Sequence, residues 1–236
     1  MRSIRARSWF AAVLLLQSAV PAFAADKAVN VSLFTPVSLA KAEDAVTAFR
    51  LNLVYGRNTS VKYVDVGLVN HTTAGPSGLG DRDLNVVQLG AVNINKRVFV
   101  AGQAGAVNFN AGEATTLFQF GAINVNRLAA YSLIQWGGVN ATAGEMVSWL
   151  QLGAINVDGG IKGLQVAAIN INQNTAKGVQ LSGINYAANG YGLQVALINY
   201  ADNASEGNVF QIGAINIIRH GARYLPVMVI ANWSGD

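Results

Sequence analysis

The chain has 236 residues, of which 12% are charged, and it contains two histidines and no cysteine. The missing cysteines exclude disulfide bonds and thiolate metal sites, and two histidines cannot form a histidine-rich metal site. The formal net charge of +4 falls to +1 without residues 1–24, because 13 basic and 12 acidic residues then remain, so charge gives no reason to expect a nucleic-acid partner.

Residues 1–24 have the pattern of a secretory signal peptide. Three arginines come first, residues 9–16 are apolar without interruption, and residues 22–24 (Ala-Phe-Ala) offer a small-x-small cleavage pattern. The apolar run is shorter than the roughly 20 residues that a membrane-spanning helix needs. We therefore expect cleavage after Ala24 and export to the bacterial periplasm, outer membrane or cell surface, with an uncleaved membrane anchor as the alternative.

Residues 25–85 are expected to form an N-terminal leader that ends in a first, degenerate repeat. Alternating apolar and polar residues predict strands over 49–55 and 61–70. The Ala-rich stretch 40–48, with two acidic residues near its start, predicts a short helix. Residues 71–83 are rich in Gly, Thr and Pro and predict a loop.

A tandem repeat array fills residues 86–217. The six-residue motif Gln-x-(Gly/Ala/Ser)-x-x-Asn occurs nine times, and successive motif asparagines lie 14 to 17 residues apart. The motif glutamines are Gln88, Gln103, Gln119, Gln135, Gln151, Gln165, Gln180, Gln194 and Gln211, and the asparagines are Asn93, Asn108, Asn124, Asn140, Asn156, Asn170, Asn185, Asn199 and Asn216. A short fixed period indicates one small unit stacked on itself, and residues 218–236, with a second degenerate copy over 227–232, are expected to cap the stack.

Each repeat unit reads as two short strands that meet at a corner. With the glutamine as position 0, large apolar residues occupy most of positions −1, +1, +4 and +6, which a straight strand cannot place on one face. A bend at the small residues of positions +2 and +3 can do so, and we expect these apolar columns to face the core. The prediction is an all-β solenoid of about eleven coils, with parallel strands about 4.8 Å apart and a length on the order of 50 Å.

In such a stack, equivalent residues of consecutive coils lie over one another. The motif asparagines and glutamines are therefore predicted to form structural ladders, in which each side-chain amide bonds to the next coil or to turn backbone. A buried amide without partners would cost about 1–3 kcal/mol, so the ladder must be nearly complete.

A transmembrane β-barrel is the alternative fold. Strands of about ten residues joined by short turns also give a period near that of the array, and export and abundant aromatic residues suit a barrel. Two observations weigh against it: the repeat spacing is nearly uniform, and the in/out alternation breaks between positions +3 and +4.

Several segments resemble the tandem repeats of bacterial exported surface-repeat proteins, a poorly characterised family. The resemblance is carried by residues 163–170, 178–185 and 192–199, by the leader segments 34–37, 51–56 and 66–71, and by the tail 225–233. It covers nearly all of the chain after residue 24 and implies a repeat fold exported to the envelope, with no catalytic, cofactor-binding or metal-binding residue. Ala167 and Ala196 depart from the usual glycine, and the family's final aromatic residue is missing.

The function expected from these features is that of a non-enzymatic envelope or surface protein acting as a scaffold or binding surface. An outer-membrane pore is the first alternative. A carbohydrate-active enzyme is less favoured, because the array's carboxylates are scattered one per turn instead of paired on one face. The sequence implies no cofactor, leaves the partner unidentified and leaves membrane association open.

Overall fold

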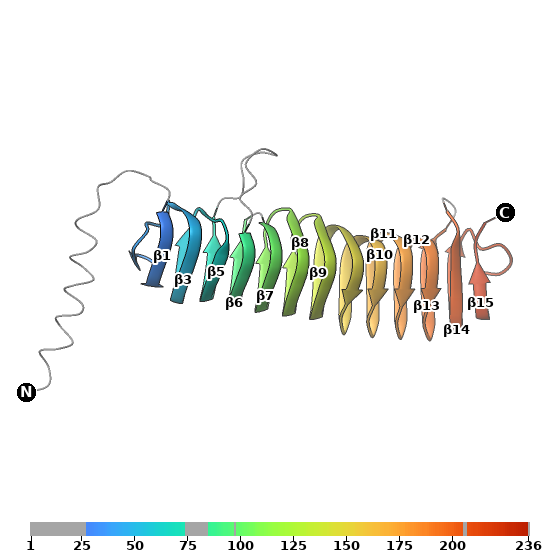
Figure 1. Ribbon diagram of the computed structural model, residues 1–236. Coiled ribbons are helices and arrows are strands. Elements are labelled where there is room, and N and C mark those ends of the chain that lie inside the picture. Colours follow the sequence, from blue (N-terminus) through green and yellow to red (C-terminus); the bar gives the residue numbers. More distant parts are fainter. Residues whose placement is uncertain (1–26, 74–84, 97, 205–206, 236) are drawn as a thin grey trace, which may run out of the picture.

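The computed structural model describes residues 27–73, 85–96, 98–204 and 207–235. In this part of the chain the strands stack one after another along a single axis and form a rod (Figure 1). The predicted signal peptide and most of the loop predicted over 71–83 lie outside the described residues.

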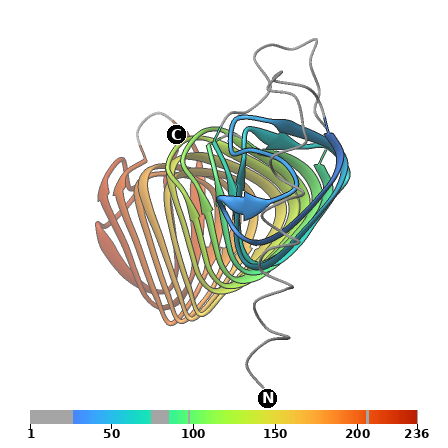
Figure 2. The same ribbon diagram turned by 90° about the vertical axis from the view of Figure 1, so that its left-hand side faces the viewer.

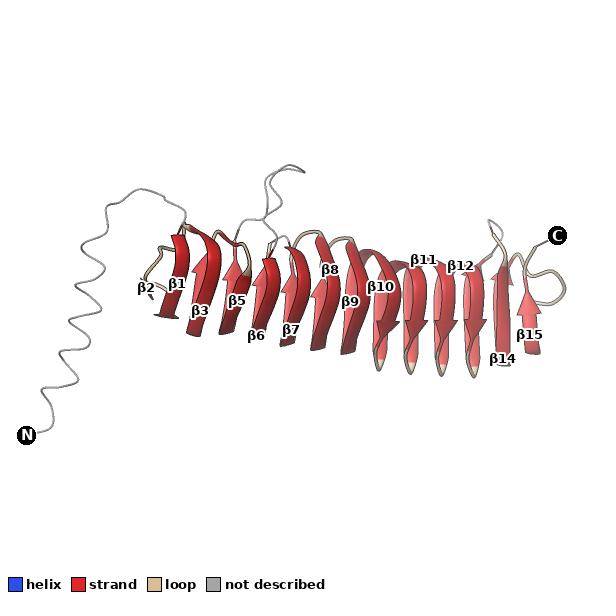
Figure 3. Ribbon diagram, viewed as in Figure 1, coloured by secondary structure: helices blue, strands red, loops and turns tan. Residues whose placement is uncertain are grey.

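Strands account for 81% of the described residues, and none of these residues lies in a helix (Figure 3). The strands form one sheet in the order β15-β14-β13-β12-β11-β10-β9-β8-β7-β6-β5-β3-β1-β2, with β4 paired to β3. Their bounds are β1 Lys27–Phe34, β2 Val37–Ser38, β3 Ala45–Asn58, β4 Ser60–Val61, β5 Val64–Thr72, β6 Asn85–Asn95, β7 Val98–Asn110, β8 Ala114–Asn126, β9 Ala130–Leu152, β10 Ile155–Val166, β11 Ile169–Leu181, β12 Ile184–Val195, β13 Ile198–Asn203, β14 Val209–His220 and β15 Val227–Trp233.

Neighbouring strands from β3 to β14 all pair in parallel, each with the strand one coil further along. The chain thus winds as a β-solenoid, as the repeat period predicted, with about 12 coils where about eleven were expected. The barrel alternative is wrong, because a barrel of this kind needs neighbouring strands that run antiparallel.

The register keeps each repeat position in one column. Asn156 of β10 lies opposite Asn140 of β9 and Asn170 of β11, and Gln165 lies opposite Gln151 and Gln180. Each coil has two limbs joined by the small-residue corner at positions +2 and +3 and, on the far side, by a turn, so the winding encloses an interior (Figure 2). The first degenerate repeat fits this register, since Asp65 lies opposite Gln88 and Asn70 opposite Asn93.

The expectation that the apolar columns face the core is wrong. The motif glutamines and asparagines point inward and are at most 2% exposed, whereas large side chains at −1, +1, +4 and +6 point outward, as Trp136 (60% exposed) and Ile184 (42%) do. The alternation is consistent with either assignment of faces, and in the interior each buried amide is paired with the amides of neighbouring coils. Val, Ile and aromatic residues suit the outer side of the strands through their β-propensity.

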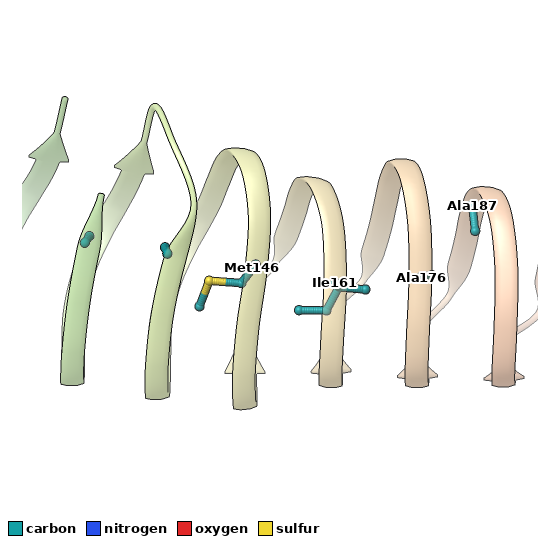
Figure 4. Packing of buried hydrophobic residues seen from close by; sticks show 6 residues of the cluster. Met146, Ile161, Ala176 and Ala187 are labelled. Carbon is teal, nitrogen blue, oxygen red and sulfur yellow. The ribbon is translucent and has the colours of Figure 1, made fainter. Parts of the chain in front are cut away.

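A thin strip of apolar side chains fills the remaining interior, at the side away from the small-residue corner. Ala114, Ala130, Met146, Ile161, Ala176 and Ala187 form one buried cluster along successive coils, of which Met146 and Ile161 are the largest (Figure 4). The interior is therefore mainly an amide network with a narrow hydrophobic strip beside it.

The helix expected over 40–48 is absent. Residues 41–44 form a turn that Asp44 closes by accepting a hydrogen bond at Oδ2 from the Lys41 amide (2.8 Å), and β3 begins at Ala45. At its start, strand β3 pairs in parallel with β4 on one side and with β1 on the other, and the hydrogen bonds of two neighbours outweigh a weak local helix propensity.

The two ends of the rod are closed differently from its middle. Strand β2 pairs antiparallel with β1, and β15 pairs antiparallel with β14. The second degenerate copy, residues 227–232, is therefore not a further coil: Asn232 lies opposite Gln211 and not opposite Asn216.

Candidate functional site: amide ladders inside, an apolar edge outside

The motif glutamines form a ladder with one direction. Each Nε2 donates to Oε1 of the glutamine one coil nearer the N-terminus, through eight bonds of 2.6–3.0 Å from Gln103 to Gln211. At the N-terminal end of the ladder the acceptor is no longer a glutamine, because Gln88 donates to Oδ2 of Asp65 (3.0 Å). At the other end, Oε1 of Gln211 has no partner among the described residues.

The motif asparagines form a second ladder that runs the opposite way. From Asn52 to Asn216, each Nδ2 donates to Oδ1 of the asparagine one coil nearer the C-terminus, through ten bonds of 2.8–3.0 Å. Most of these amides also donate to a carbonyl at position +1 of the next coil, as Asn124 does to Trp136 (3.0 Å). The asparagines thus stabilise the small-residue corner as well as the stack.

The opposed directions have an electrostatic consequence. Aligned amide dipoles add up along a chain of hydrogen bonds, as peptide dipoles do along a helix, and hydrogen bonds in such a chain polarise one another. Because the glutamine and asparagine ladders point opposite ways through the same interior, their dipoles largely cancel.

The corner requires a small residue for a steric reason. At Gly137 an added Cβ would lie 2.6 Å from Nδ2 of Asn124, 2.7 Å from the Gly121 carbonyl oxygen and 2.8 Å from Oδ1 of Asn140. Two of these three atoms belong to the asparagine ladder. The ladder and the small residue at position +2 therefore depend on each other.

A fully buried ion pair ends the glutamine ladder at its N-terminal side. Arg50 donates from Nε to Oδ1 of Asp65 (2.7 Å) and from an η-nitrogen to Oδ2 (2.6 Å), and both side chains are 0% exposed. A further η-nitrogen donates to the His71 carbonyl oxygen (3.1 Å). Asp65 accepts the hydrogen bond from Gln88, the last donor of the glutamine ladder, and Arg50 neutralises the charge of Asp65.

A third interior column, at repeat position +7, was missed at the sequence level. Its members are Thr72, Asn95, Asn110, Asn126, Thr142, Asp158 and Asn172, followed by Ala187, Ala201 and Ile218. Asn95 donates to Asn110 (3.1 Å) and Asn110 to Asn126 (2.8 Å), and Asn95 and Gln88 also exchange hydrogen bonds across the interior (2.9 and 3.1 Å). The signal was present in the sequence as a second polar residue two places after the motif asparagine.

Asp158 is the exception within this third column. It is a fully buried carboxylate, and the described residues give it no cationic partner. It accepts hydrogen bonds from Gln165 (2.7 Å) and Gln151 (3.4 Å). Burial raises the pKa of Asp158 to about 7, although hydrogen bonds from Gln151, Thr142 and Gln165 oppose the rise.

The next member of the column indicates which protonation state Asp158 adopts. Oδ1 of Asn172, one coil further on, is buried without a hydrogen-bond partner among the described residues. Earlier in the column each oxygen accepts from the side chain before it, and only a protonated Asp158 could donate in that way. Burial thus favours the neutral carboxyl group, and the hydrogen bonds that Asp158 accepts oppose it.

The surroundings of His71 change the pKa of its imidazole ring. Burial lowers the pKa of His71, and the nearby Arg57 and Arg50 lower it further. Nδ1 lies 2.8 Å from the Tyr55 hydroxyl, and the two rings meet edge to face. Among the described residues, none of the hydrogen bonds or ion pairs of His71 is to a carboxylate.

Two surface carboxylates of the array lie beside cations. Glu145 contacts Lys162 (2.8 Å) and Asp202 contacts Arg219 (3.2 Å), both at exposed positions. Within the described ranges no three His, Asp or Glu side chains gather as a metal site would require. In the same ranges no helix is long and apolar enough to cross a membrane.

The outer surface around the corner is apolar along the whole array. We call this surface the apolar edge: the outward side chains at positions −1, +1, +4 and +6 of the nine repeats, together with the small residues between them. A shallow groove of about 660 Å³ follows it, lined by Phe120, Trp136, Leu152 and Val166 with glycines between. Phe120 stacks on Phe118 (ring centroids 6.3 Å apart) and meets Trp136 edge to face (6.0 Å).

Comparisons of the chain with protein-family models, with curated proteins and with solved structures found no match. The functional argument therefore depends on the sequence and the geometry of this chain.

Proposed function

We propose that this chain is a non-enzymatic, exported bacterial envelope or surface repeat protein whose rod serves as a scaffold and binding surface. The observation that supports this most directly is the inversion of the solenoid, with amides inside and large apolar side chains outside. Contiguous apolar surface of more than a few hundred Å² is rare on a soluble monomer and marks an interaction site. Extended faces of repeat proteins commonly serve as binding surfaces.

The interior supports a mechanical role. Two hydrogen-bonded ladders run through the coils, and residues of one column keep their register from coil to coil. A rod held in this way presents its outer columns at fixed spacing, so little conformational entropy is lost when a partner binds. The binding surface is thus pre-organised by side chains that never touch the partner.

The sequence supports the exported location. The first 24 residues have the signal-peptide pattern, and the absence of cysteine frees the fold from any redox requirement after export. The resemblance to exported surface-repeat proteins agrees with the same location.

Fractionation of the bacterium that produces the protein tests the proposal. We expect the wild-type protein in the envelope fraction, with a mature N-terminus at Ala25. The double variant Trp136→Lys/Ile184→Lys places charge on the apolar edge and should move the folded protein to the soluble fraction. Leu128→Lys is the matched control, since Leu128 is also exposed (52%) but lies near the charged far side of the coil.

Two results would contradict the proposal. Retention of an uncleaved chain in the cytoplasm would remove the exported role. An unchanged envelope fraction for the double variant, with circular dichroism showing intact strands, would remove the apolar edge as the binding surface.

A further inference from the structure

Charge is strictly partitioned around each coil. In the nine repeats, none of the 72 residues at positions −1 to +6 is Lys, Arg, Asp or Glu. All ten charged residues of 86–217 fall between positions +7 and +12, and Asp158 is the buried member of that set. The array therefore has one edge without charged residues, and its described charged residues other than the buried Asp158 lie outside this edge.

The apolar edge consists of two outer faces, one on each limb of the coil, that point in opposite directions. Gln88 at position 0 and Asn95 at +7 exchange hydrogen bonds across the interior, so the two limbs of a coil face each other. Their outer sides must then point away from each other. Trp136 at +1 is exposed on one limb and Ile184 at +4 on the other, with the small-residue corner between the two columns.

Amphipathic rings lie at the margin between the apolar and charged parts. Trp149, at position −2, is 71% exposed, and Tyr131, at −4, is 49% exposed. Lys177 lies over the ring of Tyr191, 5.1 Å from its centroid, at the corresponding margin of later coils. Trp, Tyr and Lys are the residues enriched where a protein surface passes from acyl chains to headgroups.

We propose that the apolar edge seats in a lipid bilayer, with the rod lying along the membrane surface and its corner directed toward the acyl chains. This inference rests on the binding role proposed above and names its partner. A second copy of the chain could pack on only one of the two opposed faces and would leave the other in water. A fluid acyl phase covers both faces and the corner at once, over a length of about 40 Å for nine coils.

The lipid chemistry follows from the charge balance. The chain without residues 1–24 has 13 basic and 12 acidic residues, so attraction to an anionic headgroup adds little. Binding should depend on buried apolar area, as for interfacial helices with an apolar face. We expect binding to zwitterionic vesicles that is nearly insensitive to salt.

Flotation of the purified exported protein with phosphatidylcholine vesicles tests this inference. The wild type should float with the vesicles at both low and high salt, and brominated lipid should quench its tryptophan fluorescence. Trp136→Lys and Ile184→Lys should each weaken vesicle binding at least tenfold, because each places a charge on a different face. Leu128→Lys should stay within twofold of the wild type.

The outcomes separate this inference from the proposed function. Folded wild-type protein that fails to float overturns the lipid assignment. Loss of binding in only one of the two single variants, together with a stable dimer in sedimentation, assigns that face to a second copy instead. If vesicle binding fails while envelope association in cells still depends on the edge, the proposed function stands with another partner. If vesicles bind but the chain is not exported, the exported role falls and the lipid-binding surface remains.

Discussion

Replacing Asp158 by asparagine should stabilise the solenoid at pH 8 and change its stability little at pH 4. The pKa of Asp158 is raised from 3.8 to about 7, a difference of roughly three units. One unit corresponds to about 1.4 kcal/mol, so the buried carboxylate costs on the order of 4 kcal/mol once it is ionised. An amide of the same shape removes that cost and can donate to the unpartnered Oδ1 of Asn172.

The direction of the pH dependence follows from proton binding. Between pH 3.8 and about 7 the folded state holds a proton that the unfolded state has released. Stability therefore falls as pH rises through this window, and the full cost is present above pH 7. The asparagine variant lacks the group and should lack this part of the pH dependence.

Urea and thermal unfolding of both proteins between pH 4 and 8 measure the effect. For a chain of this size, about 4 kcal/mol corresponds to a difference of roughly 10 °C in Tm at pH 8. Asp202→Asn, at an exposed carboxylate, is the matched control and should follow the wild type at every pH. Parallel pH profiles for wild type and Asp158→Asn would refute the reasoning, because they would mean that Asp158 does not hold a proton in the folded state.

Three further substitutions test the interior. Arg50→Met leaves the carboxylate of Asp65 buried without its cation and should cost about 3–5 kcal/mol, whereas Arg50→Met/Asp65→Asn should recover more than half of that loss in urea unfolding. Asn156→Leu breaks the ladder in mid-array and should lower Tm more than Asn232→Leu, because Asn232 at the end donates only to backbone carbonyls. Gly163→Ala should cost about 1–3 kcal/mol, because its φ of +137° disfavours a side chain and an added Cβ would overlap the Ser148 carbonyl oxygen.

Each of these has an outcome that counts against it. A double variant no more stable than Arg50→Met would show that the cost does not come from the unpaired carboxylate. Equal Tm shifts for the two asparagine variants would count against a continuous ladder. Gly102→Ala, where an added Cβ meets nothing within 4 Å, is the control for Gly163 and should be nearly neutral by the same measurement.

The repeat period made the architecture predictable. Copies 14 to 17 residues apart fix a short coil, and an asparagine in every copy predicts a ladder, because an unpaired amide cannot be left in the interior. The structure brings the motif asparagines and glutamines together in these columns, from Gln88 and Asn93 to Gln211 and Asn216. The ladder directions were not predictable, since they depend on how each amide is rotated.

Two features were beyond the reach of local pattern. The stretch 40–48 has helix-favouring composition, but residues from Ala45 onward become a strand. Strand β1 supplies hydrogen-bonding neighbours on one side, and β4 followed by β5 supplies them on the other. Asp158 looks in sequence like one more solvated turn carboxylate, and only the stacking of column +7 shows that it is buried.

The sequence alone determined that one small unit is repeated, that each copy bends at small residues, and that amides recur at fixed places. It did not determine which side of the strand is the inside, because an alternating pattern is consistent with both assignments. Only the closed stack decided this: side chains that point into its interior lose water, and polar ones must then hydrogen-bond to one another, as the amides one coil apart do. The large apolar residues were thereby left on the outer surface, where they form the apolar edge.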